Sequence, residues 1–283
     1  MRTLQHFRGR LIRVMLSATI AVVLVGRAEG GEGMQYPVGV AAAGDGTLFI
    51  ADRNGHCIWK AKGGTLEKFF EGSSKFGTPM NAVRCVAIDH QGKLLAGDSA
   101  TREVYRFDES GKPTPLTNGG IGIPMAIAVR ASGEILVSDL ELQCIWKVAA
   151  EGGTPVKLAP VAGIVGICLD ADDVLWVVSR SQQQLRRVSA DGKVENALEG
   201  QPFSFPHNLV LDQNKTAYVT DNYAKAVWKV VAGKAEKYVE GNPLVSPVGI
   251  ARQGDSLLIA DPHAKSIFQI DAAGKTTKIV PAG

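Results

Sequence analysis

The sequence is poor in the residues that mark several common classes of protein. Of its 283 residues only 6% are aromatic and four are cysteine, and its charges nearly balance at a formal net of +3. It contains no Cys-x-x-Cys pair, phosphate-binding glycine loop, Gly-x-Ser-x-Gly elbow or basic segment interleaved with aromatic residues. These absences argue against a zinc ribbon, a P-loop nucleotidase, an α/β-hydrolase and a nucleic-acid-binding domain.

One apolar run stands near the start of the chain. Four arginines precede the run at residues 14–25, and the small residues Gly26 and Ala28 follow it. This order is typical of a secretory signal, and the run is shorter than the roughly 20 residues that a spanning helix needs. We therefore expect a signal peptide at residues 1–28, a short linker at 29–35, and a periplasmic or secreted protein. An uncleaved membrane anchor is the alternative.

Removal of residues 1–28 changes the charge balance. It takes away five arginines and no acid, which leaves 26 basic against 28 acidic residues. A nearly neutral chain gives no reason to expect a nucleic acid or an anionic membrane as partner. We expect a monomer, with no membrane contact after signal cleavage.

The rest of the chain is an internal repeat of about 42 residues. Six apolar segments end at equivalent positions, spaced by 46, 41, 40, 42 and 40 residues: Asp52, Asp98, Asp139, Ser179, Asp221 and Asp261. A second apolar run, often led by proline, precedes each of these, and two further runs follow after turn residues. Each repeat is therefore predicted to form four short strands.

A single four-stranded sheet cannot bury both of its faces, but six arranged radially can. The sequence thus predicts an all-β fold, a six-bladed β-propeller of four-stranded antiparallel blades over residues 36–283. Each repeat supplies its own four strands, so the ring should close by packing of the first blade on the last. Repeat four deviates, with Ser179 for the aspartate and Arg186 for the aromatic residue found seven positions later elsewhere; Trp176 could compensate.

The pattern Pro-x-Gly-Val-Ala, Gly-x-Leu-x-Ile-Ala-Asp, Ile-x-Lys resembles the NHL repeat, most plainly over residues 37–60 and 247–269. This resemblance implies a propeller fold but gives little information about the function. Related propellers include protein- and RNA-binding modules, sensor domains, amidating lyases, virginiamycin-B-type lyases and gluconolactonase-like hydrolases. The site, not the fold, has to decide the activity.

The propeller topology brings two sets of positions to one end of the central channel. The first set follows the proline position of each repeat: Val38, Arg84, Met125, Val165, His207 and Val248. The second follows the repeat aspartate: Arg53, Ser99, Leu140, Arg180, Asn222 and Pro262. From these, and from Asn208 beside His207, we expect a ligand site. Its residues are Arg53, Arg84, Met125, Arg180, His207, Asn208 and Asn222.

The resemblance also allows a test for metals. Gluconolactonase-like enzymes hold a divalent cation with acidic and Asn side chains in the channel, whereas the matching positions here carry no carboxylate. Amidating lyases use several channel histidines for zinc, but only His207 falls on a channel position. His56 and His263 are expected in nearby loops and His90 at the far end. We predict no cofactor, with zinc or calcium as the alternative.

His207 and the arginines each have a functional and a structural interpretation. The pair Pro206-His207 is similar to the Pro-His-Gly context of virginiamycin-B-type lyases, although these have seven blades. His207 could be a general base with Arg84 steadying an anionic intermediate, or a hydrogen-bonded wall residue. Arg84 and Arg180 could bind a ligand or pair with the repeat aspartates. Those aspartates are expected to hold turns by accepting backbone N–H groups.

The four cysteines are predicted to be buried free thiols, since Cys57 and Cys144 lie two blades apart and Cys85 and Cys168 differ in strand phase. The sequence favours an exported binding or scaffolding propeller that recognises a small polar or anionic ligand, or a protein partner, on its loop face. The alternative is a lyase or hydrolase with its active site in the channel around His207 and Arg84.

Overall fold

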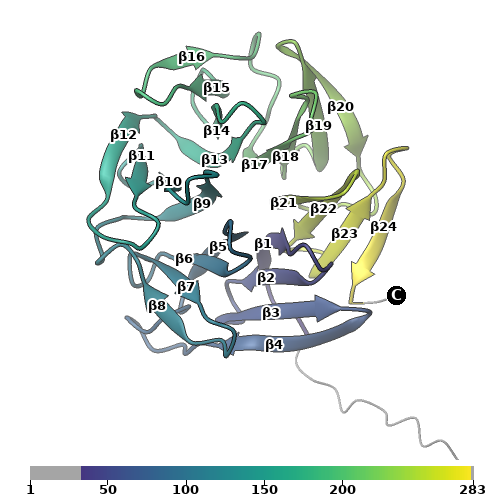
Figure 1. The fold of residues 1–283 in the computed structure, drawn as a ribbon. Coiled ribbons are helices and arrows are strands. Elements are labelled where there is room, and N and C mark those ends of the chain that lie inside the picture. The colour runs from purple at the N-terminus through teal and green to yellow at the C-terminus, as the bar shows by residue number, and fades with distance from the viewer. Residues whose placement is uncertain (1–32, 282–283) are drawn as a thin grey trace, which may run out of the picture. The chain divides into compact units, whose positions relative to one another are not determined.

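The structure, a computed structural model, describes residues 33–281. These residues form six four-stranded sheets arranged around a central channel (Figure 1). The first strands lie at the channel: β1 (Pro37–Ala42), β5 (Val83–Ile88), β9 (Pro124–Val129), β13 (Ile164–Leu169), β17 (Pro206–Leu211) and β21 (Gly249–Gln253). The second strands follow outward: β2 (Leu48–Asp52), β6 (Leu94–Asp98), β10 (Ile135–Asp139), β14 (Leu175–Ser179), β18 (Ala217–Asp221) and β22 (Ser256–Asp261).

The third and fourth strands complete each blade toward its outer edge (Figure 1). The third strands are β3 (Cys57–Lys62), β7 (Glu103–Phe107), β11 (Cys144–Val148), β15 (Leu185–Val188), β19 (Ala226–Val231) and β23 (Ser266–Ile270). The fourth are β4 (Thr65–Glu71), β8 (Pro113–Pro115), β12 (Val156–Pro160), β16 (Val194–Asn196), β20 (Lys234–Glu240) and β24 (Thr276–Val280). The predicted six-bladed, all-β propeller is confirmed.

Burial follows position in the blade. The second strands β6, β10 and β14 are buried at every residue because both of their faces pack on neighbouring blades. The sequences of these strands are therefore apolar up to the polar residues at their ends. The outer strand β20 is exposed or half-buried throughout, which its charged residues tolerate. No helix among the described residues is long and apolar enough to cross a membrane, and the predicted signal peptide lies outside the described residues.

The ring closes by packing rather than by exchange of a strand between the termini. Blade one consists of β1–β4 and blade six of β21–β24, each in sequence order. One hydrophobic cluster joins the two, with Val40, Ile50 and Trp59 from blade one against Leu258 and Ile267 from blade six. This is the closure that the sequence predicts.

The repeat aspartates hold the loops at one end of the propeller. Asp139 is fully buried and accepts hydrogen bonds from the N–H groups of Gly122 and Ile123, just before β9. It also accepts from Leu142, in the turn after β10, and from the indole of Trp146. Asp52 and Asp221 have equivalent partners, so the aspartate is a structural latch as predicted.

Blade four replaces this latch with a different set of bonds. The Arg186 guanidinium donates to Ser179 Oγ at 2.7 Å, to Ser181 Oγ at 2.7 Å and to the Ala162 carbonyl at 3.1 Å. Trp176, which the sequence offers as compensation, instead donates to Asp170 at 3.0 Å. In blade four Arg186 thus holds the loops that the aspartate holds in the other blades. It is a buried cation with no carboxylate partner among the described residues.

Candidate ligand-binding site

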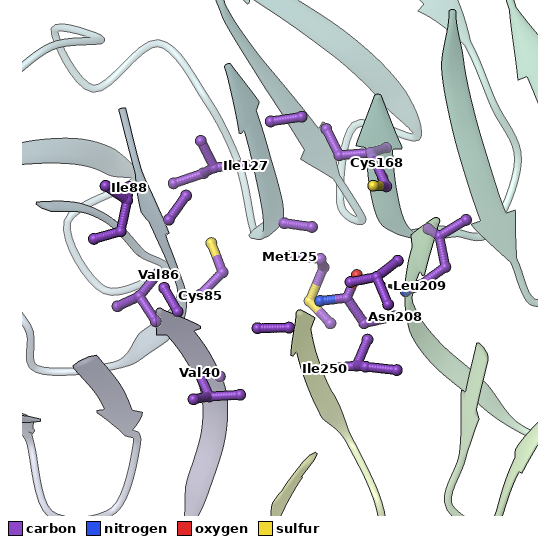
Figure 2. Close-up of a pocket in the computed structure, with 18 of the residues that line it drawn as sticks. Val40, Cys85, Val86, Ile88, Met125, Ile127, Cys168, Asn208, Leu209 and Ile250 are labelled. Atoms are coloured by element: carbon purple, nitrogen blue, oxygen red, sulfur yellow. Dashed lines mark hydrogen bonds between the residues drawn. The ribbon is translucent and has the colours of Figure 1, made fainter. Parts of the chain in front are cut away.

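The first strands line a central cavity of about 360 Å³. Its wall is largely aliphatic, with Val40, Ile127 and Ile250 among the residues drawn in Figure 2. The polar and sulfur-containing side chains, Cys168 and Met125 among them, come from separate blades. A wall of this kind gives shape to the channel but little specificity.

At one end of the channel, a smaller cavity of about 120 Å³ forms its mouth. It is lined by six of the seven residues predicted for the ligand site: Arg53, Arg84, Met125, His207, Asn208 and Asn222. Tyr36, Val38 and Val248 complete the lining. Arg180, the seventh predicted residue, does not line this cavity but contacts His207 from the side.

A β-bulge lies at the first-set position of blades one to five, and in blades one, two, three and five its residue lines the mouth. In blade one Pro37 pairs with Asp52 and Gly39 with Ala51, which leaves Val38 without a partner on β2. The register shifts at the same place in blades two, three, four and five. Because a bulge turns the extra residue out of the regular alternation, Arg84 and His207 leave the sheet and face the ligand space.

The arginines at the mouth have no acidic partner. Arg84 donates from Nε to Ser99 Oγ at 3.0 Å, and none of Arg53, Arg84 and Arg180 forms an ion pair within residues 33–281. Burial lowers the pKa of Arg84, and the neighbouring Arg53 charge lowers it further, against an opposite effect of Asp98. The expected alternative, pairing with the repeat aspartates, is not seen.

His207 is held neutral at the mouth by its surroundings. Burial, and then the positive charge of Arg180, lower the pKa of His207 to about 3. Arg180 Nη2 lies 3.0 Å from Nδ1 and 3.3 Å from Nε2 of the imidazole. Since a guanidinium can only donate, one ring nitrogen accepts from Arg180 and the other carries the single proton of the neutral imidazole. His207 can therefore donate one hydrogen bond.

Two contacts besides that with His207 fix Arg180 in place. Its Nε donates to the Pro206 carbonyl at 3.0 Å, and its guanidinium lies 3.7 Å from the centre of the Phe205 ring. Phe205 in turn stacks on Tyr223, with ring centres 4.6 Å apart and an angle of 17°. Burial lowers the pKa of Arg180 to about 10, so it stays charged at neutral pH.

Two amides add further hydrogen-bonding capacity. The Oδ1 of Asn208 accepts from the Leu209 N–H at 2.9 Å, which leaves its amide nitrogen, drawn beside Met125 in Figure 2, free to donate. The Oδ1 of Asn222 is buried without a partner among the described residues. The mouth therefore offers donors from Arg53, Arg84 and Asn208 and one unpaired acceptor at Asn222, and its lining contains no carboxylate.

This donor set does not fit a metal ion. Within residues 33–281 no three His, Cys, Asp or Glu side chains gather in a way that could hold one. Two guanidinium groups would repel a divalent cation, and calcium needs several oxygen ligands. His56 and His263 lie in the β2–β3 and β22–β23 loops, and His90 lies in the β5–β6 turn at the other end.

The four cysteines form no disulfide with one another, and Cys57, Cys85 and Cys144 are buried. Burial raises the pKa of Cys85 to about 12, and its Sγ lies 3.8 Å from the Pro124 carbonyl in the next blade. Burial also raises the pKa of Cys168 to about 11. Thiols with such values are poor nucleophiles at neutral pH.

Three features of the site were not predicted from the sequence. Tyr36 joins the lining, Arg180 acts through His207, and the Phe205–Tyr223 stack covers Arg180. Val165, expected at the mouth, is fully buried and packs with Trp176 and Leu185 instead. The bulge positions could have signalled the lining, because proline or glycine interrupts most of the first strands there.

Comparison with known proteins places the chain among propellers. Human TRIM32, an E3 ubiquitin-protein ligase, is 32% identical over 75 residues, which span 25% of this chain and 12% of TRIM32. Human NHL-repeat-containing protein 4 is 23% identical over 107 residues, 38% of this chain and 85% of that protein. The NHL resemblance is thereby supported.

Solved structures of enzymes share the fold at low identity. Virginiamycin B lyase from Staphylococcus aureus has a TM-score of 0.67 at 16% identity, with 87% of this chain and 85% of that chain covered. A gluconolactonase from Xanthomonas campestris has a TM-score of 0.71 at 14% identity, with coverage of 84% and 86%. A family model described as SMP-30/Gluconolactonase/LRE-like region matches residues 9–223. The chain belongs to the SMP-30/gluconolactonase/LRE-like family.

Proposed function

We propose that the chain is an exported binding propeller whose channel mouth takes a small anionic ligand. One observation carries the proposal: Arg53 and Arg84 meet at a concave site without any carboxylate to neutralise them. Unpaired, half-buried cations are costly. A bound anion would offset that cost and accept charge-assisted hydrogen bonds.

The rest of the mouth suits the same ligand. The neutral imidazole of His207 and the amide of Asn208 each add an uncharged donor, so a carboxylate or phosphate oxygen would accept hydrogen bonds from several sides. The apolar side chains of Met125, Val38 and Val248 exclude water from part of the site. Charge-assisted bonds are stronger in such a setting than in open water.

The proposal is tested by thermal unfolding with a panel of orthophosphate, sulfate, citrate and gluconate. An anion at 100 times its dissociation constant stabilises the folded protein by about 2.7 kcal/mol, which raises the midpoint by roughly 5–10 °C for a domain of this size. We expect at least one anion to do so in the wild type, and the double variant Arg53→Ala/Arg84→Ala to lose the shift.

The matched control is Arg187→Ala, because Arg187 lies on β15, outside the mouth, with its guanidinium facing Trp176. This variant should keep the full shift. The proposal fails if no anion in the panel raises the midpoint, or if the double variant responds as strongly as the wild type does.

Catalysis at the same mouth is the second candidate, favoured by family membership and by the unprotonated state of His207. A general base must be free of its proton, which His207 is at neutral pH. A pKa near 3 nevertheless makes it a weak base, and we therefore place binding first. Hydrolysis of gluconolactone and opening of virginiamycin B, followed in the wild type and in His207→Gln, separate the two. Turnover that disappears in the variant would establish the enzyme.

A further inference from the structure

Exposed apolar side chains gather at the same end of the propeller as the mouth. Among residues 33–281, large apolar side chains are exposed at six places. Four of them lie in loops at the mouth: Phe76 in β4–β5, Leu142 in β10–β11, Tyr223 in β18–β19 and Val245 in β20–β21. Exposed apolar groups concentrated on one face mark an interaction surface.

Two of these side chains stand on ordered parts of the fold although they face solvent. The β4–β5 loop is internally bonded: Thr78 Oγ1 donates to the Lys75 carbonyl at 2.7 Å, and Met80 is fully buried. Phe76 lies within it at 84% exposure. Tyr223 is 71% exposed and stacks on Phe205. A stacked ring such as that of Tyr223 is preorganised and loses little conformational entropy on binding.

The apolar groups lie on opposite sides of the mouth. Phe76 and Leu142 belong to loops next to blades two and three, whereas Tyr223 and Val245 belong to loops of blades five and six. These two pairs of blades face each other across the channel (Figure 1). The arginines of the mouth therefore lie between two apolar areas.

The charge of this face is positive. Arg102 pairs with Glu141 at 2.9 Å, and the repeat aspartates nearby are fully buried. The other cations of these loops and of the mouth are Arg53, Lys75, Arg84, Arg180, Lys225 and Lys265. Further acids at this end include Glu199, between β16 and β17, and Glu71 and Glu240, which end β4 and β20 and pair with Lys68 and Lys237. Acids predominate in the loops at the other end, as in β13–β14 with Asp170, Asp172 and Asp173.

We propose that this face binds an extended acidic peptide segment of a partner protein. Carboxylates of the segment enter the mouth, and apolar side chains on either side of them pack on Phe76 and Leu142 and on Tyr223 and Val245. The proposal rests on the anion-binding function of the mouth and names its ligand. An extended chain advances about 3.3 Å per residue, so nine residues cross roughly 30 Å.

A peptide suits this face better than a nucleic acid or a membrane. The arginines of the mouth are half-buried, so they can meet a single carboxylate but do not project toward a run of phosphates. Leu142 and Val245 are aliphatic and match side chains rather than bases. The apolar groups are divided by the mouth, whereas insertion into a membrane favours one continuous apolar area.

The test is selection of a phage-displayed random nonapeptide library on the protein purified from cells expressing the full chain. Enriched sequences should carry one or more acids with Leu, Ile, Phe or Trp on both sides. Synthetic copies, measured by fluorescence anisotropy, should bind Phe76→Ser and Tyr223→Ser about 10-fold more weakly and the double variant about 100-fold more weakly. Val231→Ser, which changes an exposed valine at the other end, should stay within twofold.

The inference is overturned if no peptide is enriched, if enriched peptides lack acids, or if the double variant binds them as the wild type does. It is also overturned if single-stranded RNA or phosphatidylserine vesicles, and not peptides, bind through Phe76 and Tyr223. The anion shift of the previous section separates the two proposals, because Phe76→Ser, which leaves the Phe205–Tyr223 stack beside Arg180 intact, should keep it. With that shift intact, failure of the peptide selection refutes only this inference.

Discussion

Removal of one latch aspartate should weaken the whole propeller. Asp139 is fully buried and accepts from four backbone N–H groups, those of Gly122, Ile123, Glu141 and Leu142, at 2.7–3.1 Å. It also accepts from the indole of Trp146 at 2.9 Å. Asp139→Ala leaves these donors without an acceptor, and each buried unsatisfied donor costs about 1–3 kcal/mol. Water entering the vacated space would recover part of the loss, so we expect a decrease of about 3–5 kcal/mol in the free energy of unfolding.

The pKa of Asp139 makes the effect independent of pH near neutrality. Burial would raise this pKa, but the hydrogen bonds from Leu142, Trp146 and the residues before β9 outweigh burial and hold it below its ordinary value. A carboxylate with a lowered pKa stabilises the fold above the unfolded-state pKa, and that contribution is lost only as the pH falls through the folded value. Measurements at pH 7 therefore report the full contribution.

Urea unfolding followed by tryptophan fluorescence gives the measurement. Asp255→Ala is the control, because Asp255 is an exposed loop aspartate 3.9 Å from Arg252, and it should change stability by less than about 0.5 kcal/mol. A loss below about 1 kcal/mol in Asp139→Ala would refute the latch as an organising element of the blades.

Three further changes test other parts of the structure. Because the pKa of His207 is about 3 when folded and about 6.5 when unfolded, stability should fall by about 2 kcal/mol between pH 7 and pH 5 on its account. His207→Gln should flatten that dependence in urea titrations, and an unchanged slope would contradict the lowered pKa. Ser179→Asp should supply the buried Arg186 cation with a partner and raise stability by about 1 kcal/mol, whereas destabilisation would show that Arg186 is already satisfied. Cys85 should not react with a disulfide reagent at pH 8 until urea unfolds the chain, and rapid labelling of the folded protein would contradict its burial.

Much of the fold could be predicted because it depends on the order of apolar, turn and acidic residues within each repeat. A strand of five residues, a glycine turn and a repeated aspartate are each visible within one repeat, and six copies leave little doubt about the architecture. The latch could be anticipated for the same reason, since five equivalent aspartates point to a structural role. Even the gathering of Arg53, Arg84 and His207 follows from the repeat, because equivalent positions reach the same end of a propeller.

The details of the mouth could not be predicted, because they depend on relations between strands and blades. The bulge that turns Arg84 out of β5 is a shift in the pairing of β5 with β6, and a single strand does not display it. The contact of Arg180 with His207 joins two blades. The exchange of an aspartate latch for Arg186 in blade four likewise requires the distance between Arg186 and Ser179, which residue identity alone does not provide.

The most direct test of the anion-binding mouth is the anomalous scattering of crystals soaked in bromide. Bromide is a probe for sites where unpaired N–H donors and positive charge converge, and it requires no knowledge of the natural ligand. The account predicts an anomalous peak in the mouth, in contact with Arg53 or Arg84, which disappears in crystals of Arg53→Ala/Arg84→Ala. A mouth without bromide, in crystals that bind the ion elsewhere on the surface, would contradict it.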